Sequence, residues 1–137
     1  MTEQLDHHAA LVYVMIATSS VDGAMTDDEF ARIGEIVSEL PVFADCDDNE
    51  LPKTAEACGE LLSADGGVRH VLRLVREALP EKLRETAYWV ALEIVAADRL
   101  ARPEEIRFLD MLRDALELDR STTAAIERGI RARNMTL

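Results

Sequence analysis

Two acidic turns with the same internal spacing are the features of this sequence best suited to chemistry. In each turn an aspartate is followed seven residues later by a glutamate, Asp22 by Glu29 and Asp98 by Glu105. Carboxylate oxygens are the ligands that Ca²⁺, Mg²⁺ and Mn²⁺ prefer in proteins. If the two turns lie together, their carboxylates repel one another unless a cation or an arginine neutralises them. The duplicated spacing therefore predicts a divalent-cation site.

Ordinary helix capping is the second interpretation of the same acids. Thr26 and Glu29 match a capping box, in which each side chain binds an orphan backbone N–H of the first turn. Glu104 and Glu105 follow Pro103, where the positive end of a helix dipole favours anions. Asp22 and Asp98 suit the turns that precede such helices. Capping explains each acid alone, whereas the cation site explains why the spacing occurs twice.

The repeat extends beyond the acids and predicts how the turns are positioned. Residues 13–40 align with residues 89–116 without a gap. The matching pairs are Tyr13 with Trp89, Val14 with Val90, Asp22 with Asp98, Glu29 with Glu105, Phe30 with Ile106, Ile33 with Leu109, Ile36 with Leu112, and Leu40 with Leu116. Each half reads as a buried helix, an acidic turn and an amphipathic helix. Such a repeat predicts two helical hairpins packed about a pseudo-two-fold axis, with both turns at one end of the bundle.

The rest of the chain predicts an all-α fold. Apolar residues recur every three to four positions, and the expected helices span 6–19, 26–40, 52–63, 68–79, 80–97, 103–116 and 121–133. The first is apolar on all sides, which is typical of a helix at the centre of a bundle. The sixth has its apolar stripe at Ile106, Leu109, Leu112 and Leu116. No linker divides the chain, so residues 1–137 form one compact domain of about seven helices.

Three residues of the fifth helix carry specific expectations. Trp89 is expected in the core and Tyr88 at its edge. Glu93 lies among apolar neighbours. It either faces solvent or pairs with a nearby arginine, or it is a buried acid facing the cluster near Asp98.

Composition limits the class of partner. Of the 137 residues, 48% are hydrophobic and 31% charged, a balance typical of a soluble globular protein. The net charge of −12 disfavours nucleic acid and anionic membranes and favours cations and basic protein surfaces. The longest apolar stretch, residues 9–17, is far shorter than the ~20 residues of a membrane span. The N-terminus lacks the positive charge of a signal peptide, so we expect a cytoplasmic protein without a membrane anchor.

Two stretches of sequence resemble the signatures of the tellurite-resistance TerB-like family. They are VDGAMTDDEF at 21–30 and AADRLARPEEIRFL at 96–109, and the resemblance covers nearly the whole chain. It implies a compact bundle of about seven helices, related to the N-terminal domain of DjlA-type co-chaperones. It also implies a link to tellurite and other chemical stress, and an acidic metal-binding cluster at Asp22, Glu29, Asp98 and Glu105. Asp28 and Glu104 are adjacent candidates.

One departure from the family pattern bears on the metal. The second turn reads Asp98-Arg99 where the family has Asp-Gly. Arg99 could enter the acidic cluster as a built-in counter-ion, in place of a cation.

Other chemistries have weaker support. The first turn resembles the second half of an EF-hand loop, but Thr18 and Ser20 stand where that loop carries acids. No histidine follows a glutamate by three residues, as di-iron bundles require. Cys46 and Cys58 lack the spacing of a zinc site and are expected as reduced thiols. Phosphate-loop and hydrolase motifs are absent from the sequence.

Two functional hypotheses follow, both for a protein that is not an enzyme. In the first, the acidic turns bind a divalent cation that tunes a stress-response assembly. In the second, the protein is an interaction module whose acidic face docks a basic protein partner without metal.

Overall fold

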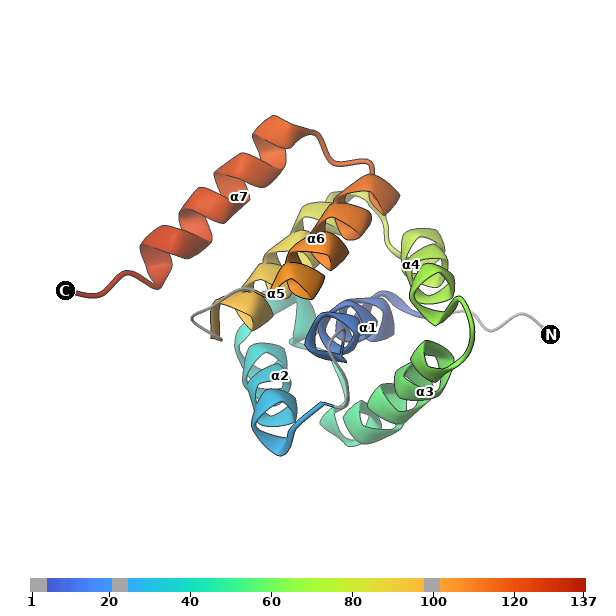
Figure 1. Cartoon of the computed structure of the whole chain (residues 1–137). Helices are drawn as coiled ribbons and strands as arrows, with labels where there is room; N and C mark the ends of the chain where they lie inside the picture. The colour runs from blue at the N-terminus through green and yellow to red at the C-terminus, as the bar shows by residue number, and fades with distance from the viewer. Residues whose placement is uncertain (1–4, 21–24, 98–101) are drawn as a thin grey trace.

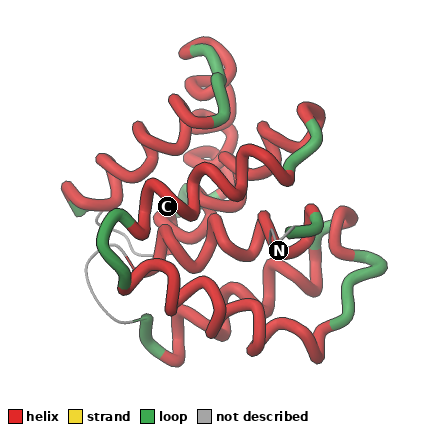
Figure 2. The backbone as a smooth tube through the Cα atoms, turned by 90° about the vertical axis from the view of Figure 1, so that its right-hand side faces the viewer, coloured by secondary structure: helices red, strands yellow, loops and turns green. Residues whose placement is uncertain are grey.

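The structure is a computed structural model that describes residues 5–20, 25–97 and 102–137. Within these ranges the backbone is helical, with short connections and no strand (Figure 2). The α-helices of the described chain are α1 (His7–Ser20), α2 (Asp27–Glu39), α3 (Leu51–Ser63), α4 (Gly67–Ala78), α5 (Arg84–Ala97), α6 (Pro103–Ala115) and α7 (Arg120–Arg133). Short 3₁₀ turns are η1 (Pro41–Phe43), η2 (Asp48–Glu50) and η3 (Glu81–Leu83). The all-α fold expected from the sequence is confirmed.

Helix α1 lies at the centre of the bundle. Every residue from Ala10 to Ser19 is buried. The helix packs against α3, α4 and α5, which surround it in Figure 1. A helix with no polar face has no side to offer to water, so it must be covered all round. The expectation of a central first helix is confirmed.

Helix α5 is the second buried helix and connects α1 to the far side of the molecule. It packs on α1, α6 and α7, and α7 packs mainly against it (Figure 1). Tyr88 is only 3% exposed, whereas Trp89 is partly exposed. The expectation that Trp89 is more buried than Tyr88 was therefore wrong. The geometry of the α-helix explains this difference in burial. Neighbouring side chains point about 100° apart around the helix axis, so Trp89 faces away from the core when Tyr88 faces into it.

Two other sequence expectations need correction. Ile106 is 51% exposed, and Phe108 occupies the core instead. The α6 stripe is therefore Glu105, Phe108, Leu109 and Leu112, all of them buried. The fifth helix also begins later than expected, at Arg84. The 3₁₀ turn Glu81–Leu83 precedes it, closed by a hydrogen bond from the Leu83 N–H to the Pro80 carbonyl.

The α1–α5 and α2–α6 pairs match in length, as the repeat predicts. Both buried helices have 14 residues, and both amphipathic helices have 13. The pseudo-two-fold relation between the hairpins stays a prediction.

The corner between α3 and α4 depends on two glycines. Gly66 has a positive φ of 69°, a conformation that costs other residues energy. Gly67 begins α4 so close to α3 that a Cβ there would lie 2.2 Å from the Leu61 carbonyl oxygen. Backbone atoms cannot move aside as a flexible side chain can, so this corner requires glycine.

We predict that Gly67→Ala destabilises the protein by about 2–3 kcal/mol, because the added methyl group overlaps the α3 backbone. Gly34→Ala is the control. Nothing lies within 4 Å of a Cβ at Gly34, in the middle of α2, so the change should stabilise by about 0.5–1 kcal/mol. Urea unfolding measures both, and equal effects would contradict this account of the corner.

Candidate acidic site and the buried carboxylate beside it

The two acidic turns follow the C-terminal ends of α1 and α5. Figure 1 shows these two ends on the same side of the bundle, nearer the viewer. Asp22 and Asp98 lie outside the described residues, as do Gly23 and Arg99. Glu29 and Glu105 are described, and each is the third residue of the helix that follows its turn.

Glu29 completes the predicted capping box at the start of α2. The Thr26 backbone N–H donates to Glu29 Oε1 at 2.8 Å, and the Glu29 N–H donates to Thr26 Oγ1 at 3.2 Å. Two donors that a helix start leaves unpaired are thereby satisfied. The capping interpretation of Glu29 is confirmed.

Glu105 makes the equivalent contact at the start of α6. The Arg102 backbone N–H donates to Glu105 Oε1 at 2.9 Å. Pro103 occupies the first position of the helix, where its missing N–H is no loss. Unlike Glu29, Glu105 is buried, with 6% of its surface exposed. The two repeated glutamates therefore make the same contact, because each accepts a hydrogen bond from the backbone N–H of the residue before its helix.

Capping uses one carboxylate oxygen of each glutamate and leaves acceptor capacity on the other. Asp28 and Glu104, the adjacent candidates, are exposed. Among the residues that the structure describes, no three His, Cys, Asp or Glu side chains are grouped so that they could hold a metal ion. A cation site built here would therefore need ligands from the turns themselves.

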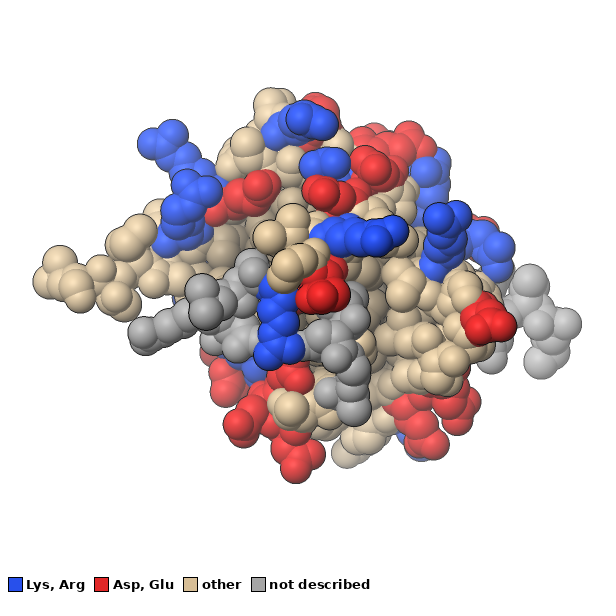
Figure 3. Space-filling model, viewed as in Figure 1, with Lys and Arg blue, Asp and Glu red and all other residues tan. Residues whose placement is uncertain are grey.

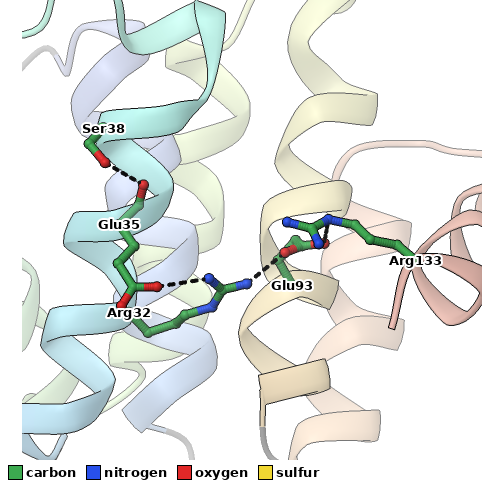
Figure 4. Close-up of polar contacts among 5 residues, drawn as sticks. All are labelled: Arg32, Glu35, Ser38, Glu93 and Arg133. Atoms are coloured by element: carbon green, nitrogen blue, oxygen red, sulfur yellow. Dashed lines mark hydrogen bonds and ion pairs between the residues drawn. The ribbon is translucent and has the colours of Figure 1, made fainter. Parts of the chain in front are cut away.

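Glu93, one turn before the end of α5, is the most buried carboxylate described in this region. Its side chain is 4% exposed and lies between two arginines from other helices (Figure 4). Arg32 of α2 donates through Nη2 to Glu93 Oε2 at 2.8 Å. Arg133, at the end of α7, places Nε 3.2 Å from Glu93 Oε1, an ion pair without hydrogen-bond geometry.

This arrangement joins three helices through one buried charge. Arg32 also pairs with the exposed Glu35 at 3.1 Å, so a line of alternating charges runs from α2 across α5 to α7. A buried carboxylate is tolerated only when cations compensate it, so the positions of α2 and α7 are linked to Glu93. The sequence singled out Glu93. It gave no signal for its partners, which are 61 and 40 residues away along the chain.

A second polar contact ties α7 to α5. The Tyr88 hydroxyl of α5 interacts electrostatically with the Glu127 carboxylate of α7. Burial, together with the negative charge of Glu127, raises the pKa of Tyr88 to about 12. The phenol is therefore protonated at neutral pH.

We predict that Arg32→Gln combined with Arg133→Gln lowers the free energy of unfolding by about 3–5 kcal/mol, because Glu93 is left buried without a cation. Arg128→Gln combined with Arg131→Gln is the matched control. It removes the same charge from exposed positions of α7 and should change stability by less than about 0.5 kcal/mol. Urea unfolding of both variants gives the comparison. Similar losses would show that the Glu93 pairs contribute nothing specific.

The charges are divided unevenly along the chain. Residues 1–66 contain 15 acidic and 2 basic residues, whereas residues 67–137 contain 12 acidic and 13 basic residues. We call residues 1–66 the acidic half. Figure 3 shows Asp and Glu side chains gathered over α2 and α3, and most Lys and Arg side chains over α4, α6 and α7. The net charge of −12 therefore comes from the acidic half of the chain.

An apolar groove crosses the molecule where α7 meets α5 and η1. It has two adjacent lobes of about 430 and 420 Å³, which share Glu85, Trp89 and Ile126. The first lobe is completed by Leu40, Pro41, Val42 and Thr86, and the second by Ser121, Thr122 and Ala125. We call this the Trp89 groove. Sequence reasoning missed it because its walls come from three separate segments.

The fold defines a class, a compact all-α bundle built around the two buried helices α1 and α5. A family model described as tellurite resistance protein TerB matches residues 8–128, and the chain belongs to this family. No curated protein and no solved structure matches the chain. No described helix is long and apolar enough to cross a membrane.

Proposed function

We propose that this TerB-family protein is a non-enzymatic cytoplasmic component of the response to tellurite and other chemical stress. In this proposal its two acidic turns bind one divalent cation, Ca²⁺, Mg²⁺ or Mn²⁺. Asp22, Glu29, Asp98 and Glu105 are the proposed ligands. Cation binding then changes how the protein assembles with its partners.

The observation that carries this proposal is the matched placement of Glu29 and Glu105. Both occupy the third position of a helix, both bind the backbone N–H of the preceding residue, and both helices begin at the same end of the bundle. A repeat that served packing alone would need apolar residues at matching positions. Capping accounts for each glutamate by itself, but it does not require an aspartate seven residues before both of them.

The electrostatics of this end also favour a cation. The C-terminal ends of α1 and α5 carry partial negative charge, and neither helix has a basic residue in its last turn. Oxygen ligands beside two such helix ends suit a hard divalent ion. The buried Ser19 hydroxyl, which has no hydrogen-bond partner in the described part of the chain, lies three residues before Asp22. Arg99 is the competing counter-ion in this proposal.

Calorimetric titration with Ca²⁺, Mg²⁺ and Mn²⁺ tests the cation site. We expect saturable heat for the wild type with at least one of the three ions, and its loss in Asp22→Asn combined with Asp98→Asn. These positions are preferable to Glu29 and Glu105, whose capping contacts would make any change partly structural.

The control removes the same charge elsewhere. Glu56→Gln combined with Glu60→Gln changes two exposed acids of α3 and should leave the heat as in the wild type. A wild type that gives no saturable heat would refute the cation site. The cation site would also be refuted if Asp22→Asn combined with Asp98→Asn bound the ion as well as the wild type does.

A second candidate function is metal-independent docking of a basic protein partner. The uneven charge distribution favours it, because the acidic half presents a large excess of carboxylates over α2 and α3. Electrostatic attraction to such a surface accelerates association and weakens as salt is added. Binding that persists in a chelator and falls with salt is the expected result for this candidate.

A further inference from the structure

The Trp89 groove is apolar yet open to solvent. Leu40, Val42, Trp89 and Ile126 are all only partly buried, although each packs against the core. Two lobes of similar volume lie on either side of the pair formed by Trp89 and Ile126. An apolar groove open to solvent is the kind of surface that can accept the apolar face of an amphipathic segment.

Both walls of the groove are fixed by contacts that do not involve the groove itself. On the η1 side, His8 Nε2 lies 2.9 Å from the Val42 carbonyl oxygen, and the His8 ring stacks on the buried Phe43. On the α7 side, the pairs from Tyr88 to Glu127 and from Glu93 to Arg133 hold the helix against α5. A partner therefore meets a preformed groove and need not order it, which lowers the cost of binding.

Charge identifies the kind of partner. Among the described residues that line the groove, Glu85 is the charged one, and it is exposed. The wall formed by Leu40, Pro41 and Val42 belongs to the acidic half and follows the exposed Glu39 at the end of α2. Helix α2 has no basic residue in its last turn to offset the negative end of its dipole. A second copy of the chain, which also carries a net charge of −12, would be repelled.

We propose that the Trp89 groove binds an amphipathic, basic segment of another protein. Its apolar side chains enter the lobes on either side of Trp89, and a lysine or arginine of the segment pairs with Glu85. Side chains three or four positions apart on a helix lie on one face, the spacing needed to fill neighbouring lobes. The inference rests on the second candidate function, the docking of a basic partner, and is independent of the cation site.

Trp89 is the only tryptophan of the chain, so its fluorescence reports on the groove directly. The probe is a synthetic helical peptide of leucine and lysine, and the comparison peptide carries glutamate in place of lysine. We expect the lysine peptide to shift Trp89 emission to shorter wavelength in a saturable way, as water leaves the indole. The glutamate peptide should leave the emission unchanged.

Two pairs of variants locate the binding. Glu85→Lys should weaken the lysine peptide about tenfold, whereas Glu60→Lys, the same reversal on α3, should weaken it less than about twofold. Ala125→Phe fills the second lobe and should likewise weaken binding about tenfold. Ala124→Phe is the control. It places the same ring on α7 outside the groove lining and should not weaken binding.

Each contrary result has a distinct meaning. Equal weakening by Glu85→Lys and Glu60→Lys would overturn the groove but leave docking to the acidic half standing. No emission shift with the lysine peptide, or an equal shift with the glutamate peptide, would overturn the groove proposal altogether. An emission shift that depends on protein concentration without peptide, and is abolished by Ala125→Phe, would assign the groove to a second copy of the chain instead.

Discussion

The complete burial of α1 against α5 is the constraint on which the rest of the structure depends. Helix α1 has no polar face and must be covered all round, whereas α5 is polar mainly in its first turn and must be covered along most of its length. Helices α3 and α4 cover α1, while α6 and α7 cover α5. Because both buried helices end on the same side of the bundle, whatever follows them begins there. Core packing thus places the described ends of α1 and α5, which precede the two acidic turns, on one side of the bundle.

Polar contacts then help to set how α2 and α7 are placed against α5. Arg32 joins α2 to α5 through Glu93, close to the same end of the bundle, and Arg133 joins α7 to the same carboxylate. Hydrophobic packing is tolerant of small rotations, whereas a buried charge is satisfied only in one arrangement. The Glu93–Arg133 ion pair therefore contributes to holding the end of α7, and α7 in turn forms one wall of the Trp89 groove. The acidic end and the Trp89 groove therefore both involve α5.

Patterns local in sequence predicted the elements of the fold well. Periodic apolar residues located the helices, and Thr26 with Glu29 marked a helix start to the residue. Contacts between distant segments were not predictable in this way. Ile106 fits the apolar period of α6 but lies on its exposed side, whereas the neighbouring Glu105 is buried. The partners of Glu93 and the walls around Trp89 exist only once α2, α5 and α7 are packed together.

The central claim is that the two acidic turns form one cation site at one end of the bundle. Paramagnetic broadening of backbone amide NMR signals by substoichiometric Mn²⁺ tests it most directly, because the effect depends steeply on distance from the ion. The account predicts that the amides of residues 22–29 and 98–105 broaden together while those of α3 and α7 stay sharp. Broadening confined to one turn, spread across the acids of α3, or absent throughout would contradict it.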